Sequence, residues 1–398
     1  MDGDPAVEPE LDSFTLFLPL PYRVALIIVL GVWAWGANLH YLHLIKIDVP
    51  ALIRYPPRSS TTQPTHYLSC YRLATILSIP LGCSLLLFWA ITQGHAQSVL
   101  EWELLPNIYL LFLVLAFALP FSVASSSGRT RFLTTLKRIS VGGLAETQDG
   151  KFGDILMADA LTSYAKVLGD LYVAICMFFS HGVSSTGKPD RTCGAAFAVP
   201  VILAIPSAIR LRQCLIEYGR VRRAGGRAGV HLANALKYSS AFPVIILSAL
   251  QRGYDGHKMG MSEAGLFRLW LFFVFLNSAY SFYWDVAKDW DLSLFSAQRS
   301  NLEHPWGLRR QRYFHSKQIY YAVVVMDFFL RCTWSIKLSP HLDHFNDLEG
   351  GIFLMEALEV FRRWVWVFLR VETEWVRNTR GPMPDDILLG EFPKFDED

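Results

Sequence analysis

Long apolar runs recur along the chain between residues 24 and 370. About 20 consecutive apolar residues are enough for a helix to cross the hydrocarbon core of a bilayer. Nine runs approach or exceed this length and predict membrane-spanning helices. They are 24–46, 72–92, 107–124, 155–180, 194–210, 236–251, 265–286, 318–336 and 351–370. We therefore expect an all-α fold, a polytopic bundle of transmembrane helices.

A tenth, weaker element covers residues 131–145. It is basic and amphipathic, which is typical either of a helix lying at the membrane interface or of a short buried helix. Counting it or not gives nine to ten transmembrane helices. We divide the chain into a polar tail at 1–20, membrane helices at 21–190 and 191–378, and a second polar tail at 379–398.

The composition supports a membrane protein. Hydrophobic residues make up 52% of the chain and charged residues 18%, whereas soluble domains carry about 25% charged residues. The six cysteines form no CxxC pair and no metal-ligand spacing, so we expect neither a disulfide framework nor a metal site. No nucleotide-binding loop, HExxH or GxSxG motif occurs, and we expect no enzyme activity, no cofactor and no nucleic-acid partner.

The distribution of arginine and lysine predicts the orientation in the membrane. Basic residues gather at 210–227 and at 299–317, whereas the 337–350 segment is neutral to acidic. Loops rich in arginine and lysine usually face the cytoplasm. The 337–350 segment then faces the lumen or the outside, and the C-terminal tail is cytoplasmic. Nine helices would put the N-terminus in the lumen, and ten would put it in the cytoplasm.

Charged residues inside the apolar runs are the strongest chemical signal. Arg362 and Arg363 stand side by side in the middle of the 351–370 run, where a single charge costs about 2.5–3.5 kcal/mol on insertion scales. The other polar residues in or beside the runs are Asp159, Lys237, Tyr238, Asp285, Asp289, Arg331, Trp334 and Glu359. Helical spacing puts Asp285 and Asp289 on one helix face, and likewise Arg331 and Trp334.

This mixture of charges indicates recognition of a small tetrahedral anion. Arginine presents a planar fork of donors that matches phosphate oxygens, and lysine adds a compact charge. Carboxylates would separate the cations when the site is empty and would weaken binding enough for release. Because adjacent helical residues point about 100° apart, either both arginines hold the anion or one holds it while Glu359 holds the other.

Structural interpretations remain open for each residue. Ion pairs can join helices, Asp285 and Asp289 can end a helix at the interface, and Lys237 can extend to the head groups. Trp334 and Tyr238 also fit an interfacial aromatic belt. A purely structural role is least convincing for Arg362 and Arg363, because burying two adjacent charges doubles the free-energy cost of placing them in the membrane.

Four motifs and one upstream stretch resemble the EXS-domain family. Residues 358–374 are similar to its signature helix with the pattern LEVxRRxxWxxxRxExE. The stretches 283–290, 327–334 and 231–239 also resemble EXS motifs, and the upstream 210–218 is similar to the RxxQCLRRY stretch. The resemblance extends from about residue 20 to 378.

The resemblance implies a phosphate-transporting membrane protein with ten spans and a cytoplasmic N-terminus. Larger members carry an N-terminal SPX domain that senses inositol pyrophosphates, and this chain is similar to the short fungal members without it. That form implies a Golgi protein that returns luminal phosphate, a by-product of glycosylation, to the cytosol and supports glycosyltransferase recycling and retention of luminal ER proteins. The implied phosphate-pathway residues are Asp159, Lys237, Tyr238, Asp285, Asp289, Arg331, Arg362 and Arg363, with Trp334 as a gate on the non-cytoplasmic side.

Two other functions remain open. The first is a membrane sorting protein that binds cytosolic coat or glycosyltransferase-sorting adaptors, with vestigial transport. The second is a phosphate exporter of the plasma membrane, and the ER is a further alternative location. Besides phosphate and the lipid bilayer, a second copy of the chain in a homodimer is a further expected partner.

Overall fold

The structure is a computed structural model that describes residues 11–55, 65–119, 126–180, 182–254, 261–296, 305–333 and 349–380. Within these ranges the chain is built from helices and turns without a strand, which confirms the all-α prediction. The helices of the first half are α1 (Ser13–Phe17), α2 (Leu20–Leu44), α3 (Val49–Leu52), α4 (His66–Thr92), α5 (Ala96–Glu101), α6 (Leu104–Ala118), α7 (Ser126–Lys137), α8 (Lys151–Ser163) and α9 (Ala165–Phe179).

The second half contains the long helices that carry most of the predicted site. They are α10 (Ala198–Arg223), α11 (Gly229–Ser239), α12 (Ala241–Arg252), α13 (Glu263–Trp284), α14 (Lys317–Arg331) and α16 (Glu349–Arg380). Short turns flank them: the π-helical turns η2 (Arg138–Gly142) and η4 (Asp285–Asp289), and the 3-10 turns η3 (Thr147–Asp149) and η6 (Pro305–Gly307).

Among the described residues, fewer helices have the length and composition of a membrane span than the sequence predicted. Six helical segments of the described chain are long and apolar enough to cross a bilayer. A seventh is gained if α8 and α9, which meet at a 62° bend, form one broken span. The expected nine to ten spans are not confirmed. The 131–145 element is divided between α7 and η2, and α16 carries many charges along its 32 residues.

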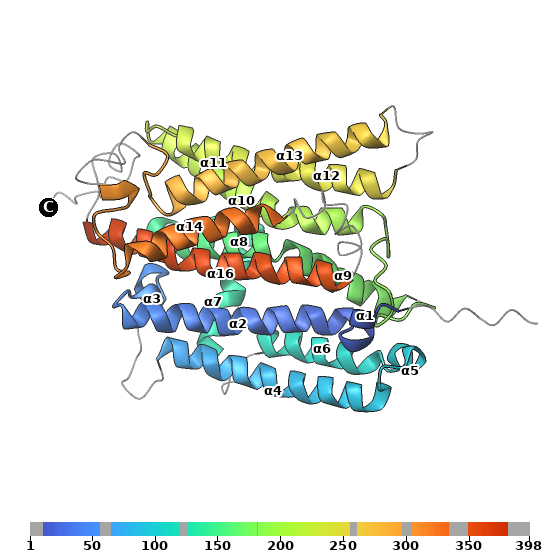
Figure 1. Ribbon diagram of the computed structural model, residues 1–398. Helices are drawn as coiled ribbons and strands as arrows, with labels where there is room; N and C mark the ends of the chain where they lie inside the picture. Colours follow the sequence, from blue (N-terminus) through green and yellow to red (C-terminus); the bar gives the residue numbers. More distant parts are fainter. Residues whose placement is uncertain are drawn as a thin grey trace, which may run out of the picture.

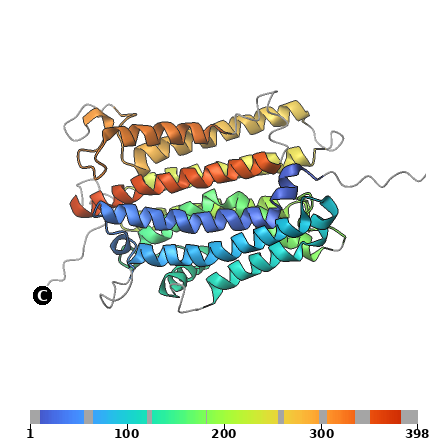
Figure 2. The ribbon, with the colours of Figure 1, turned by 60° about the horizontal axis from the view of Figure 1, so that its bottom comes forward.

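Helix α16 lies in the middle of the bundle (Figure 1). It packs against α2 on one side and α14 on the other, and α8 also contacts it. The turned view shows the same order of α2, α16 and α14 (Figure 2). Protein therefore surrounds α16, and its charged residues face other helices rather than lipid, as charged residues in membrane helices nearly always do.

Apolar packing fixes α16 in this position. A cluster of buried residues joins the end of α2, α8, α14 and α16 and includes Leu42, Tyr320, Trp366 and Leu369, each at most 1% exposed. A second cluster joins α2, α4, α6 and α9. Since the two clusters meet along α2, this helix links the charged half of the bundle to the apolar half.

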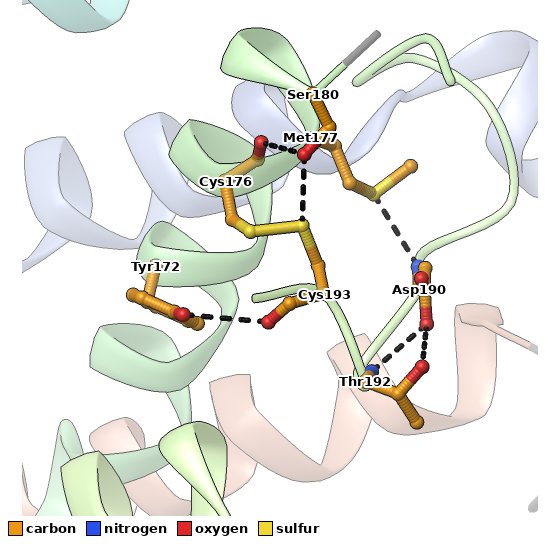
Figure 3. Close-up of a disulfide and its surroundings, with 7 residues drawn as sticks. All are labelled: Tyr172, Cys176, Met177, Ser180, Asp190, Thr192 and Cys193. Carbon is orange, nitrogen blue, oxygen red and sulfur yellow. Dashed lines mark hydrogen bonds between the residues drawn. A yellow bond between two sulfur atoms is a disulfide. The ribbon is translucent and has the colours of Figure 1, made fainter. Parts of the chain in front are cut away.

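A disulfide joins the C-terminal end of α9 to the loop before α10 (Figure 3). It connects Cys176 and Cys193, so the sequence-based expectation of unpaired cysteines was wrong for this pair. The reason is that α9 and the loop fold back on each other over 17 residues. In the same loop Thr192 donates two hydrogen bonds to Asp190, from its backbone N–H and its hydroxyl, which lower the pKa of that carboxyl.

The disulfide agrees with the orientation predicted from the basic loops, but not with the cytoplasmic N-terminus that the resemblance implies, because α2 begins at the disulfide end. It lies at the end of the bundle where α16 begins, opposite the end where α10 finishes in its basic run (Figure 1). Disulfides persist in the oxidising lumen of the secretory pathway and outside cells, and are rare in the cytosol. The disulfide end therefore corresponds to the luminal or external side, and the basic end corresponds to the cytoplasm.

We predict that Cys176→Ser and Cys193→Ser each lower the free energy of unfolding by about 3 kcal/mol. A disulfide that closes a loop of about 15 residues is expected to contribute that much. Thermal unfolding in detergent measures the loss. In unfolded wild-type protein the free thiol of Cys83 should react with a maleimide directly, while Cys176 and Cys193 should react only after reduction. Equal labelling of both before and after reduction would contradict the bond.

Candidate functional site

Buried charged side chains meet at the centre of the bundle, between α8, α10, α11, η4, α14 and α16. Each comes from a helix whose opposite face is apolar, so the folding of the helices against one another turns the charges inward. The site brings together the eight predicted pathway residues and Glu359, and adds several that the sequence did not single out.

Arg362 and Arg331 share two aspartates. Arg362 donates to Asp327 at 2.9 Å and lies 3.5 Å from Asp285, while Arg331 donates to Asp327 at 3.0 Å and also pairs with Asp285. Glu359, one turn before Arg362, accepts two further bonds at 2.7 and 2.8 Å. All the charges in this network are therefore paired, as burial requires.

Arg363 has different surroundings. Its Nε donates to the Ser163 hydroxyl at 2.9 Å and its Nη2 to the Thr162 hydroxyl at 3.3 Å, and its guanidinium lies 4.4 Å from the centre of the Trp366 ring. No ion pair joins it to any described carboxylate, although it is only 9% exposed. The two arginines thus separate: Glu359 and the aspartates hold Arg362, and Arg363 keeps an unmatched positive charge.

Asp159 anchors the opposite wall of the site. It accepts a hydrogen bond from Arg210 at 2.6 Å and another from the hydroxyl of Tyr238 at 2.5 Å. The same hydroxyl accepts from Arg210 at 3.1 Å, so the three groups form a closed triangle. Gln213 fixes the far end of the Arg210 side chain.

Lys237 is the second buried cation without a carboxylate partner among the described residues. It is 6% exposed, and its ammonium lies 4.3 Å from the Tyr238 ring centre and 5.5 Å from that of Trp284. Cation–π contacts are worth up to about 2 kcal/mol, whereas burying an ion costs several. Asp159, Asp285 and Asp289 attract it from beyond ion-pair distance. Lys237 and Arg363 both act electrostatically on Asp159 and on Asp285, so the two cations lie near the same pair of carboxylates.

A cavity of about 410 Å³ lies toward the basic end of the bundle and reaches Arg210 and Trp284, which contact Tyr238 and Lys237. Asp289 and Arg370, whose charged atoms are 4.0 Å apart, line it together with Arg210. Asp285 and Asp289 flank the π-helical turn η4, in which the Trp290 N–H bonds back to Asp285. Turns of this kind are frequent at functional sites. Asp285 consequently belongs to the buried network and Asp289 to the mouth of the cavity.

The sequence missed four contributors. Asp327 stands four residues before Arg331 in an apolar helix, a spacing that indicates an ion pair. The sequence-based prediction of the site nevertheless includes only Arg331. Arg210 was assigned to the basic loop, but its burial on α10 places it in the site. Ser163 and Thr162 carry no charge and gave no signal. The predicted gate, Trp334, lies outside the described residues.

Comparison with known proteins identifies the family. The sequence model of the EXS family matches residues 18–376. This chain belongs to the EXS family. The match covers both predicted membrane segments, and it agrees with the resemblance drawn from the motifs.

Three relatives within the family are similar in sequence to this chain. It is 30% identical over 385 residues to Protein ERD1 homolog 2 of Schizosaccharomyces pombe, covering 89% of this chain and 96% of the relative. It is 30% identical to Protein ERD1 of Kluyveromyces lactis, covering 97% and 100%. Solute carrier family 53 member 1 of Mus terricolor is 33% identical over 57% of this chain but only 33% of its own length. These names point to membrane-protein or transporter roles rather than to an enzyme.

We predict that Asp327→Ala destabilises the protein by about 3–5 kcal/mol, because it leaves Arg331 and Arg362 short of a buried partner. The midpoint of thermal unfolding in detergent measures this. Glu101→Ala, at an exposed carboxylate, serves as the control and should stay within about 0.5 kcal/mol. A similar midpoint for both variants would show that the network contributes nothing.

Proposed function

We propose that this EXS-family protein conducts inorganic phosphate across the Golgi membrane, from the lumen to the cytosol. The observation that carries the proposal is the pair of buried cations without an ion-pair partner among the described residues, Lys237 of α11 and Arg363 of α16, which both act on Asp159 and Asp285. An anion bound between them would offset the cost of their burial, which no described carboxylate does by direct contact.

The surrounding contacts favour phosphate as that anion. Arg363 has a planar fork of donors, and Lys237 supplies a compact charge, the two features that suit tetrahedral oxygens. The hydroxyls of Ser163 and Thr162 accept from Arg363 and donate their own protons to Glu359 and to the Asp159 carbonyl, so they hold the guanidinium in position without neutralising its charge. Asp159 and Asp285 lie near both cations and keep the attraction moderate, which a conducting site needs for release.

The roles of the remaining residues follow from their partners. Arg362 and Arg331 are locked by Asp327, Asp285 and Glu359, so they position the wall of the pathway and supply field rather than free donors. Asp289 and Arg370 border the cavity that lies toward the basic end. Release toward the cytoplasm through this cavity gives the path a direction consistent with the predicted orientation.

The Golgi location and the link to retention of ER proteins and glycosyltransferase recycling rest on the similarity to the ERD1 proteins. In the acidic Golgi lumen a larger share of phosphate is monoanionic. Since the same cations hold a monoanion less tightly than a dianion, phosphate that enters from the lumen as the monoanion is retained less strongly in the site. No covalent bond forms or breaks in this mechanism.

The second candidate function is a sorting role, in which the loops and tail bind coat or glycosyltransferase-sorting adaptors. The basic run that ends α10 favours an interaction at the cytoplasmic end, because Arg222 and Arg223 are exposed there. Under this alternative the buried cations would be structural, and phosphate flux would be absent.

Flux of radiolabelled phosphate into proteoliposomes tests the proposal, with Lys237→Met as the decisive variant. The charge lost has no carboxylate partner, so the fold should survive. A charge-assisted contact is worth about 1.5–3 kcal/mol, so we expect flux to fall by about tenfold or more. Arg363→Gln should behave in the same way.

Arg222→Gln is the matched control, because this arginine is exposed and its side chain contacts Tyr218. The flux through this variant should equal that of wild type. Sulfate and a larger phosphate ester, added in excess, report selectivity. Wild-type protein that transports no more phosphate than empty liposomes would overturn the proposal, and tight adaptor binding by the same preparation would then favour sorting.

A further inference from the structure

A second charged cluster lies at the disulfide end of the bundle, away from the central site. Glu349, the first residue of α16, accepts hydrogen bonds from Arg23 of α2 at 2.7 Å and from Arg191 at 2.8 and 3.2 Å. Arg191 belongs to the loop that the Cys176–Cys193 bond ties to α9, and its Nε lies 3.8 Å from Asp170.

Arg23 has a full set of partners in this cluster. Besides Glu349, it donates to the Leu18 carbonyl and to the Thr15 hydroxyl, both at 2.7 Å. It is 2% exposed. The cluster therefore closes the end of the bundle with paired charges, and the disulfide holds one of them, Arg191, in place over α16.

Glu356 breaks this pattern. It is 4% exposed, and no hydrogen bond or ion pair joins its carboxyl to another described residue. Seven residues, nearly two full turns or about 10 Å along the helix, separate it from Glu349 on one side and from Arg363 on the other. Since i and i+7 lie on one face of a helix, Glu356 stands between the disulfide-end cluster and the free arginine of the central site.

The charged groups that act on Glu356 come from several elements. They are Asp170 and the exposed Lys166 of α9, Arg23 of α2 and Arg191 of the tethered loop. On its own helix the nearby charged residues are Glu349, seven residues before it, Glu359, three residues after it, and Arg363, seven residues after it. None of these makes a direct contact, so an ionised Glu356 would be a buried charge without a hydrogen-bonding partner, which is the costly state for a carboxylate.

We propose that Glu356 is a protonation site of the anion pathway, which admits phosphate from the disulfide side when neutral and repels it when charged. The inference rests on the proposed function. The physical reason is that a carboxylate in a low-dielectric space repels an approaching anion strongly. A protonated carboxyl carries no charge and can donate its proton to a phosphate oxygen.

Two consequences follow for transport. Flux should increase as the pH on the disulfide side falls, which suits an acidic lumen as the source of phosphate. Above the titration midpoint of Glu356 the neutral fraction, and with it the flux, should decline by up to about tenfold per pH unit.

The test measures phosphate flux in proteoliposomes at equal pH on both sides, from pH 5 to 8, with the membrane potential clamped. Equal pH makes the orientation of the inserted protein irrelevant. We expect the wild-type flux to fall with rising pH, and Glu356→Gln to flatten this profile because its side chain stays neutral. At pH 8 the variant should conduct at least about fivefold faster than wild type.

Glu101→Gln, at an exposed carboxylate of α5, is the matched control and should keep the wild-type profile. It also corrects for the titration of phosphate itself, which every sample shares. If Glu356→Gln folds poorly, Glu356→Asp retains a titrating group at a displaced position and should shift the midpoint of the profile.

The outcomes separate the two proposals. A Glu356→Gln profile that matches wild type, with normal flux, overturns the protonation site and leaves phosphate transport standing. An unshifted midpoint in Glu356→Asp does the same. Wild-type protein without flux at any pH overturns both proposals together.

Discussion

The cost of burying charge inside a membrane governs this structure. Every helix that carries an ionisable residue at depth must present it to another helix, because lipid offers no partner. Helix α16 carries the largest number, and it is the helix that α2, α8 and α14 enclose. Its neighbours supply Asp327, Asp285 and Ser163, and the arrangement of the bundle around α16 follows from these requirements.

The same constraint makes the exceptions informative. Paired charges such as Arg362 with Asp327 are adequately explained by the stability of the fold. Lys237, Arg363 and Glu356 are buried without a matching charge in contact, and a purely structural role does not account for them. Arg363 and Glu356 lie on one face of α16 and Lys237 lies on α11, and the proposed route for phosphate passes beside these three residues.

The apolar runs predicted the fold class and most helices, because burial in lipid or protein demands apolar residues at helical spacing. The number of spans could not be predicted, since α14 and α16 mix charged residues with apolar ones and the bend between α8 and α9 depends on packing. Charge at membrane depth identified Arg362, Lys237 and Asp285. It could not reveal which arginine is free, because that depends on Asp327 and Ser163 reaching α16 from other helices, nor that Cys176 meets Cys193.

Equilibrium binding of radiolabelled phosphate to the purified protein, by scintillation proximity, tests the central claim most directly. It reads the occupancy of the site without requiring passage across a membrane. We predict saturable binding to wild type, with loss of about tenfold or more in affinity in Lys237→Met and in Arg363→Gln, and wild-type affinity in Arg222→Gln. Equal phosphate affinity in wild type and both site variants would contradict the account.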